Sequence, residues 1–380
     1  MEFTVDKGTF ADCVAWAARV LPARPASPIL SGIKIQAFEN NQIEVSSFDY
    51  EVSARELISG EVEVPGEVLV TGKLLADISR SLPGDKVHCK LEEGRLQIRS
   101  GNSNYSLQEM PLHEYPKLPV VPAAIGTVPA DTFKKGIQKV AFAAAHDAGS
   151  APVFTGVKFE FKEGQLKLVA TDKVRLAVFD APWEGEPIET NAPVIVKAKV
   201  AQDVARTLVA DDGKVEIGLA IDGGLNVISF KTGNRTTTSQ LTDGDFPDLS
   251  RLFLDSYPIK VAVAKDAFVN ALKRVALVST FSTNEAVLNF REGEVELEAG
   301  QGDEANAAEI LPCELKGEDI TIVVKPSYML DGLAVVDESF TSLQFTGPSK
   351  AIEMGGQNSV DGEAEPNFRY LFVPINTGKR

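Results

Sequence analysis

The sequence repeats itself three times at the scale of a whole domain. Each repeat opens with a polar helix-start signal and a phenylalanine, Phe10, Phe133 or Phe268, followed by apolar residues four and seven positions later. This spacing places the three apolar side chains on one face of a helix. The phenylalanines stand 123 and 135 residues apart, and a period of that length corresponds to a complete domain. The 380-residue chain is therefore predicted to form three similar domains rather than one large fold.

Each repeat divides again into two similar halves. A strand pair with period-two alternation follows the first helix, then a second helix and a second alternating strand pair. The predicted helices span residues 6–21, 71–82, 131–145, 197–209, 265–279 and 325–336. Asp77, Asp203 and Asp331 recur at the same place in the second helix of each repeat. The chain is thus predicted to contain six related units of one helix with strands.

The net charge of −16 is unevenly distributed along the chain. The six predicted helices hold 14 basic and 7 acidic residues, net +7, which leaves −23 on the predicted strands and loops. If the helices face one way, that face is positive and the opposite face negative. Lysine and arginine also occur in helices for propensity and solubility alone, so the distribution by itself leaves both interpretations open.

Several features indicate where such a chain resides. The first six residues, Met1 to Asp6, are acidic and strand-like, unlike a signal peptide. No stretch approaches the roughly 20 apolar residues of a membrane span. Cys13, Cys89 and Cys313 are odd in number and far apart, which argues against a disulfide framework and a cysteine metal site. The expected location is the reducing cytoplasm.

No active-site motif stands out. The sequence lacks a Gly-rich phosphate loop followed by lysine, a dinucleotide fingerprint after a strand and a metalloprotease histidine pair. His88, His113 and His146 are isolated, and a lone histidine is more often a surface or core residue than a catalyst. The prediction is a protein without catalytic residues, metal or cofactor. An enzyme whose site leaves no local motif remains an alternative.

Four groups of residues carry a family resemblance. They are Leu21–Pro25 with Pro28–Gly32, Ala170–Ala177, Phe246–Asp248 with Arg251, and Tyr370–Pro374. Their order and spacing on a threefold repeat of this length resemble the bacterial DNA polymerase III β subunit, the replicative sliding clamp. The resemblance covers essentially the whole chain.

The resemblance implies an α+β fold of three tandem clamp domains, at residues 1–122, 123–255 and 256–380. Each domain would hold two β-α-β-β-β half-units. Two chains would join head to tail as a homodimeric ring with helices inside and sheets outside. Inward basic helices would attract DNA phosphates without sequence preference, and the acidic exterior would keep the duplex inside.

The implied function is a non-catalytic processivity factor of DNA replication within the DNA polymerase III holoenzyme, in the nucleoid-associated cytoplasm. Such a clamp encircles duplex DNA and tethers the replicative polymerase, the clamp loader and other replication and repair proteins through a peptide cleft between domains 2 and 3. Matching DNA-contacting positions are Arg24, Lys73, Lys197 and Lys199. The family's aromatic DNA-contacting loop corresponds here to His146–Pro152, which contains no such aromatic residue.

The resemblance also assigns protein contacts. The partner-peptide cleft would comprise Phe154, Thr171, Arg175, Leu176, Pro247, Arg251, Leu252, Leu371, Val373 and Pro374. The dimer seam would pair Tyr105 and Leu107 of the first domain with Leu277 and Val278 of the third. An apolar slot with polar edges suits a short peptide with aliphatic or aromatic anchors.

Three departures from the family pattern fall near the cleft. Lys173-Val174 stands where many clamps carry Gly-His, Val373 replaces a more usual methionine, and Asn376–Arg380 extends the C-terminus. One alternative is therefore a second clamp copy with an altered cleft that tolerates a clamp-targeting antibiotic. Another is an acidic repeat scaffold that never meets DNA.

Overall fold

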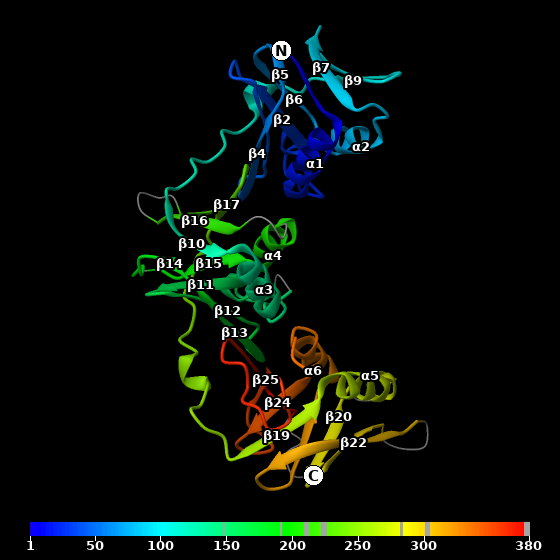
Figure 1. Cartoon of the computed structure of the whole chain (residues 1–380), viewed down its shortest axis with the longest axis vertical. Coiled ribbons are helices and arrows are strands. Elements are labelled where there is room, and N and C mark those ends of the chain that lie inside the picture. The colour runs from blue at the N-terminus through cyan, green and yellow to red at the C-terminus, as the bar shows by residue number, and fades with distance from the viewer. Residues whose placement is uncertain are drawn as a thin grey trace. The chain divides into compact units, whose positions relative to one another are not determined.

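The computed structural model describes residues 1–146, 149–190, 192–208, 213–221, 226–281, 284–300 and 305–375 (Figure 1). Within these ranges no helix is long and apolar enough to cross a membrane. The C-terminal extension Asn376–Arg380 and two residues of the His146–Pro152 loop lie outside them.

The described residues form six β-α-β-β-β units in tandem. The first pair comprises β1 (Glu2–Asp6), α1 (Lys7–Ala17), β2 (Gly32–Ala37), β3 (Gln42–Phe48) and β4 (Val52–Ser59), then β6 (Gly66–Thr71), α2 (Gly72–Ser81), β7 (Lys86–Glu92), β8 (Arg95–Ser100) and β9 (Ser103–Gln108). The second pair comprises β10 (Ala124–Pro129), α3 (Ala130–Ala141), β11 (Gly156–Lys162), β12 (Gln165–Thr171) and β13 (Arg175–Pro182), then β15 (Val194–Lys197), α4 (Ala198–Thr207), β16 (Lys214–Ala220), β17 (Val227–Thr232) and β18 (Arg235–Gln240).

The third pair comprises β19 (Ile259–Ala264), α5 (Lys265–Phe281), β20 (Ala286–Arg291), β21 (Glu294–Ala299) and β22 (Ala307–Lys316), then β23 (Ile320–Val324), α6 (Pro326–Leu333), β24 (Phe340–Phe345), β25 (Ile352–Gln357) and β26 (Phe368–Phe372). Two short strands, β5 (Glu61–Val64) and β14 (Glu184–Gly185), complete the strands of the described residues. All six predicted helices are present, so the pattern of one helix and three following strands is confirmed.

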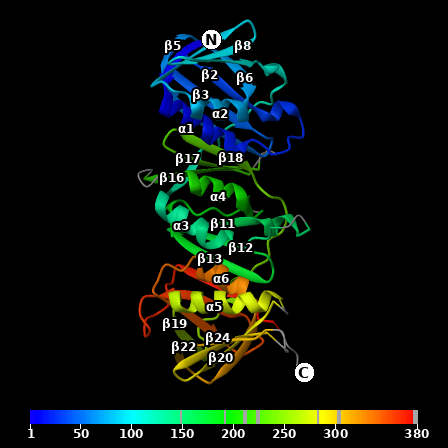
Figure 2. The same cartoon turned by 90° about the vertical axis from the view of Figure 1, so that its right-hand side faces the viewer.

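The helix-start signal of the first repeat caps its helix, as the sequence predicts. The Asp6 carboxylate accepts hydrogen bonds from the Thr9 N–H at 2.8 Å and the Thr9 hydroxyl at 2.9 Å, which caps α1. These bonds hold the pKa of Asp6 below its ordinary value. Phe10, Phe133 and Phe268 are each 0% exposed, so the repeated phenylalanine is the anchor that fixes each first helix to its sheet. Helices α1 and α2 pack together, as do α5 and α6 (Figure 2).

The chain divides into two compact units. The first contains residues 1–131, 184–186 and 203–241, with a five-stranded sheet, β5-β1-β7-β8-β9, and a nine-stranded sheet, β14-β10-β16-β17-β18-β4-β3-β2-β6. Antiparallel pairing of β18 with β4, from Arg235↔Glu56 to Ser239↔Val52, joins strands of two successive repeats.

The second unit contains residues 132–183, 187–202 and 242–380 and is built on a twelve-stranded sheet. Its order is β15-β11-β12-β13-β26-β25-β24-β19-β22-β21-β20-β23. Strand β13 pairs with β26 from Arg175↔Phe372 to Phe179↔Phe368. This pairing brings the central repeat against the end of the chain and creates the setting for the candidate site.

Candidate functional site

A solvent-open groove of about 200 Å³ lies in the second unit where β13 pairs with β26. Five separate segments form it: the 3₁₀ turn Pro152–Thr155, the β12–β13 turn, the segment before β19, the β24–β25 loop and the end of β26. Its lining residues are Phe154, Thr171, Lys173, Val174, Arg175, Leu176, Pro247, Leu249, Leu252, Ala351, Leu371, Phe372 and Val373.

The groove exposes apolar side chains to solvent. Leu252, Val373 and Val174 are 52%, 46% and 40% exposed, while Leu176 and Leu371 beneath them are buried in a small apolar cluster. Exposed apolar side chains gathered over a buried floor mark an interaction site more often than a chance patch. The groove is therefore suited to a short apolar peptide segment.

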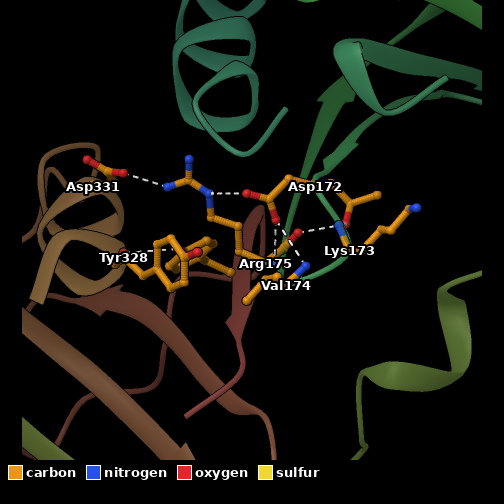
Figure 3. Close-up of polar contacts among 8 residues, drawn as sticks. Asp172, Lys173, Val174, Arg175, Tyr328 and Asp331 are labelled. Carbon is orange, nitrogen blue, oxygen red and sulfur yellow. Dashed lines mark hydrogen bonds and ion pairs between the residues drawn. The ribbon is translucent and has the colours of Figure 1, made fainter. Parts of the chain in front are cut away.

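A tight turn between β12 and β13 shapes one wall (Figure 3). The Thr171 hydroxyl donates to the Arg175 carbonyl oxygen at 2.6 Å and accepts from the Lys173 N–H at 3.0 Å. The Asp172 carboxylate accepts the N–H groups of Val174 at 3.0 Å and Arg175 at 2.9 Å. Lys173 sits at φ +78°, a left-handed conformation that favours glycine.

Arg175 ties this turn to helix α6. It is 6% exposed, and its guanidinium donates to Asp172 Oδ2 at 3.0 Å and to Asp331 Oδ2 at 2.5 Å (Figure 3). The guanidinium also lies 5.2 Å from the centre of the Tyr328 ring. Burial alone would lower the pKa of Arg175, but the bond to Asp331 and the surrounding charges raise it above its ordinary value. The side chain thus stays charged inside the protein.

The repeated aspartate of the second helices is used differently in the third repeat. In α2, Asp77 lies 4.0 Å from Arg80, and in α4, Asp203 lies 3.3 Å from Arg206, each pair three residues apart. In α6 the equivalent third residue is Ala334. Without an arginine on its own helix, Asp331 bonds to Arg175 of the central repeat instead.

A second polar cluster holds the opposite wall. Glu353 of β25 has a side chain only 7% exposed, and it accepts two hydrogen bonds from Arg369 of β26, at 2.6 and 2.8 Å, and one from the Tyr257 hydroxyl at 2.5 Å. Arg369 also donates to the Leu254 carbonyl oxygen at 3.2 Å and lies 4.3 Å from the centre of the Phe253 ring. Burial first, and the bond to Glu353 second, raise the pKa of Tyr257 to about 12. The wall segment is therefore fixed to the sheet.

The structure brings eight of the ten predicted cleft residues to this groove. They are Phe154, Thr171, Arg175, Leu176, Pro247, Leu252, Leu371 and Val373. Arg251 is exposed beside Leu252 but does not line the groove, and Pro374 is buried. Leu249, Ala351 and Phe372 also line it and were missed. Leu249 could have been found from its neighbours Pro247 and Leu252, whereas Ala351 comes from the β24–β25 loop and leaves no local signal.

The predicted DNA-contacting residues are all exposed. Arg24 lies in the loop after α1, and Lys73 is the second residue of α2. Lys199 is the second residue of α4, the place that Lys73 occupies in its own repeat, and Lys197 ends the preceding strand. Two of the four thus stand at equivalent helix N-termini, where backbone N–H groups favour anions.

The predicted dimer residues differ in exposure. Leu277 on α5 is 67% exposed, and Tyr105 and Val278 are half-buried. Leu107 on β9 is 3% exposed and belongs to the core of its own repeat, so it offers little surface to a second chain. Ile310 on β22, which was not predicted, is 60% exposed. Helix α5 packs on β22, so exposed apolar side chains occur on both of these packed elements.

The described residues contain no cluster of side chains suited to hold a metal ion. The three cysteines are free and buried. Burial raises the pKa of Cys313 to about 11 and that of Cys89 still further, which disfavours the reactive thiolate. A repeat-built fold with an open apolar groove defines a binding protein.

The chain belongs to the DNA polymerase III beta subunit family, the beta sliding clamps. Its N-terminal, central and C-terminal domain models match residues 1–119, 127–248 and 251–366. The family is a non-catalytic part of DNA polymerase III. Three tandem clamp domains are thereby shown, while the boundaries at residues 122 and 255 remain predictions.

Similar proteins extend over the full chain. The beta sliding clamp of Streptomyces coelicolor is 40% identical over 378 residues, 99% of each chain. The beta sliding clamp homolog GriR of Streptomyces muensis is 36% identical over 375 residues, also 99% of each. A solved Pseudomonas aeruginosa sliding clamp bound to griselimycin is 26% identical, covers 99% of each chain and has a TM-score of 0.90.

Proposed function

We propose that two copies of this chain close into a ring around duplex DNA and tether a DNA polymerase, and other replication proteins, through the groove. The observation that carries the proposal is the groove itself, set in a chain that matches sliding clamps from end to end. Threading retains a ring on DNA topologically, so its DNA contacts need only be weak and without sequence preference.

The DNA contacts are assigned to the helices. Lys73 and Lys199 each stand in the first turn of a second helix, where the lysine charge and the free backbone N–H groups both attract phosphate. Arg24 and Lys197 add exposed positive charge near other helix ends. These contacts are to the backbone of DNA, which suits a ring that must slide over any sequence.

Ring closure is assigned to two open strand edges. Within the described residues, β8 is the one strand that pairs with β9. The first half of β22, up to Pro312, pairs with β21, whereas β19 pairs only with the second half, from Cys313. Each edge can accept a strand from another chain. Pairing β9 of one copy with β22 of the next would be a head-to-tail contact that closes with two copies.

Leu277 and Ile310, which are exposed on adjoining elements of the third repeat, would be covered by this contact. Tyr105 of β9 is half-buried and would face them. The seam therefore combines backbone hydrogen bonds with a small apolar contact, as in a sheet extended across two molecules.

The comparisons do not favour the alternative that this chain is a second, antibiotic-tolerant clamp copy. The relative named as a homolog, GriR, is 36% identical, and the relative named simply as a beta sliding clamp is 40% identical. Two of the three departures that suggested it, Lys173-Val174 and Val373, line the groove. The third, Asn376–Arg380, lies outside the described residues.

The ring proposal is tested by retention on DNA. The purified chain, opened onto nicked circular DNA by a clamp loader, should remain bound through gel filtration and be released when the circle is cut. Retention on both circular and cut DNA would show ordinary DNA binding. Retention on neither DNA would contradict the proposal, and it is the result that the acidic-scaffold alternative predicts.

A further inference from the structure

Basic side chains line the groove, and no acidic side chain does. Its lining residues include Lys173 and Arg175 but neither aspartate nor glutamate. Arg175 is buried and forms ion pairs with both Asp172 and Asp331, so these three side chains together carry one net negative charge. Lys173 is exposed, and in the described part of the chain it has no ion-pair partner. One cation at the mouth of the groove is therefore left without a carboxylate.

The position of Lys173 is set by its backbone. Its N–H bonds to Thr171 Oγ1 at 3.0 Å, and the turn holds it at φ +78°. Its side chain points away from Arg175 (Figure 3), and Nζ lies 4.8 Å from the centre of the Phe154 ring, which also lines the groove. The ammonium group thus lies over an apolar wall, where a bound chain would come within reach.

None of the neighbouring acids forms an ion pair with Lys173 within the described residues. Asp172 and Asp331 bond to Arg175, and Asp172 also accepts backbone N–H groups of the turn. Asp248, on the opposite wall segment, accepts the N–H and hydroxyl of Ser250 at 3.0 and 2.7 Å. A lysine at φ +78° is less stable than glycine by about 1 kcal/mol of folding free energy, because its Cβ is crowded in the left-handed region.

We propose that Lys173 makes this groove select peptides that carry a carboxylate beside their apolar anchor. The inference rests on the proposed function, because it names the class of peptide that the groove takes. Charge complementarity supports it: an apolar floor for the anchor, one unpaired cation at the rim and no lining anion. An exposed ion pair of this kind contributes about a two- to fivefold preference.

The test uses fluorescence anisotropy with labelled eight-residue peptides that share a Leu-Phe anchor and carry either Asp or Asn at each flanking position in turn. The protein is the full chain, compared with K173Q and with K260Q as the matched control. Lys260 is an exposed lysine of β19 that does not line the groove. At low salt, at least one Asp peptide should bind about threefold more tightly than its Asn partner, and this preference should vanish in K173Q and persist in K260Q.

The outcomes separate the two proposals. Peptides that bind equally well with Asp or Asn, or a preference that survives in K173Q or disappears in K260Q, would overturn the role of Lys173 and leave the groove as a peptide site. Failure of every peptide to bind would instead contradict the groove's proposed function. A preference due to Lys173 should also shrink in 0.5 M salt, about three to five times the physiological level, because exposed pairs are screened.

Discussion

Replacing Arg369 by glutamine should loosen the wall of the groove without touching a bound peptide. Glu353 would keep its bond to Tyr257 but lose the two bonds from Arg369, at 2.6 and 2.8 Å, that balance its charge. Removing one partner of a fully buried ion pair costs about 3–5 kcal/mol. The Arg369 side chain is 36% exposed, and solvent screening reduces the expected cost to about 2 kcal/mol.

Hydrogen exchange is the appropriate assay, because several domains need not unfold as one unit and local opening is the quantity that changes. A cost of about 2 kcal/mol corresponds to roughly 30-fold faster exchange, confined to the amides of residues 249–257 and the adjoining β25–β26 pair. Peptide affinity should fall by a smaller factor than protection from hydrogen exchange. Affinity depends on the fraction of molecules in which the wall segment is folded against the sheet, and that fraction stays large.

Two variants control this experiment. R291Q removes an arginine that is 55% exposed and lies 3.8 Å from Glu296, a pair worth about 0–0.5 kcal/mol. The double variant E353Q/R369Q leaves no unpaired buried carboxylate and should recover part of the loss. Exchange in R369Q within threefold of the parent, or a double variant as unstable as R369Q, would refute the reasoning.

Three further predictions concern the other surfaces. L277D should convert the proposed dimer into a monomer of 40.8 kDa by light scattering, and a persistent dimer would remove Leu277 from the proposed seam. D337N should destabilise α3 by about 1–2 kcal/mol, because Lys139 is 4% exposed and its ammonium lies 3.2 Å from Asp337. Burial raises the pKa of Asp337, but the bonds and charges of Lys135 and Lys139 outweigh this effect, so the pKa of Asp337 lies below 3.8. The stabilising contribution of Asp337 is therefore present above pH 3.8 and is lost as the pH falls through its lowered pKa. Hydrogen exchange of the α3 amides should accelerate over this pH range in the parent protein and not in D337N. K73Q and K199Q should each reduce the salt dependence of DNA binding by about one unit of log–log slope, and an unchanged slope would show that the lysine does not contact phosphate.

The sequence was sufficient to predict the repeats and their elements, because each depends on local periodicity. The helix boundaries agree within a few residues, and the clearest difference has a physical cause. Residues 131–145 were predicted as one helix, but α3 ends at Ala141. The N–H of Ala145 instead donates to the Phe154 carbonyl oxygen at 2.7 Å, which turns the chain toward the groove.

Contacts between distant segments could not be predicted in the same way. The stretch from Phe246 to Pro258 was assigned to the cleft through the family resemblance alone, and its attachment to the sheet by Glu353 and Arg369 was not predicted. Alternation along a strand shows which side chains face the core but not which strand lies at its edge. The pairings of β18 with β4 and of β13 with β26 therefore became visible only in the structure.

The bond between Asp331 and Arg175 has a consequence for stoichiometry. It depends on Ala334, where the first two repeats carry an arginine, and in the described residues it occurs in the third repeat alone. Three nearly equivalent repeats thus yield one reinforced groove per chain. A ring of two such chains would therefore have two peptide-binding sites, although it would contain more than two domains. A third partner could bind only after one of the first two had dissociated.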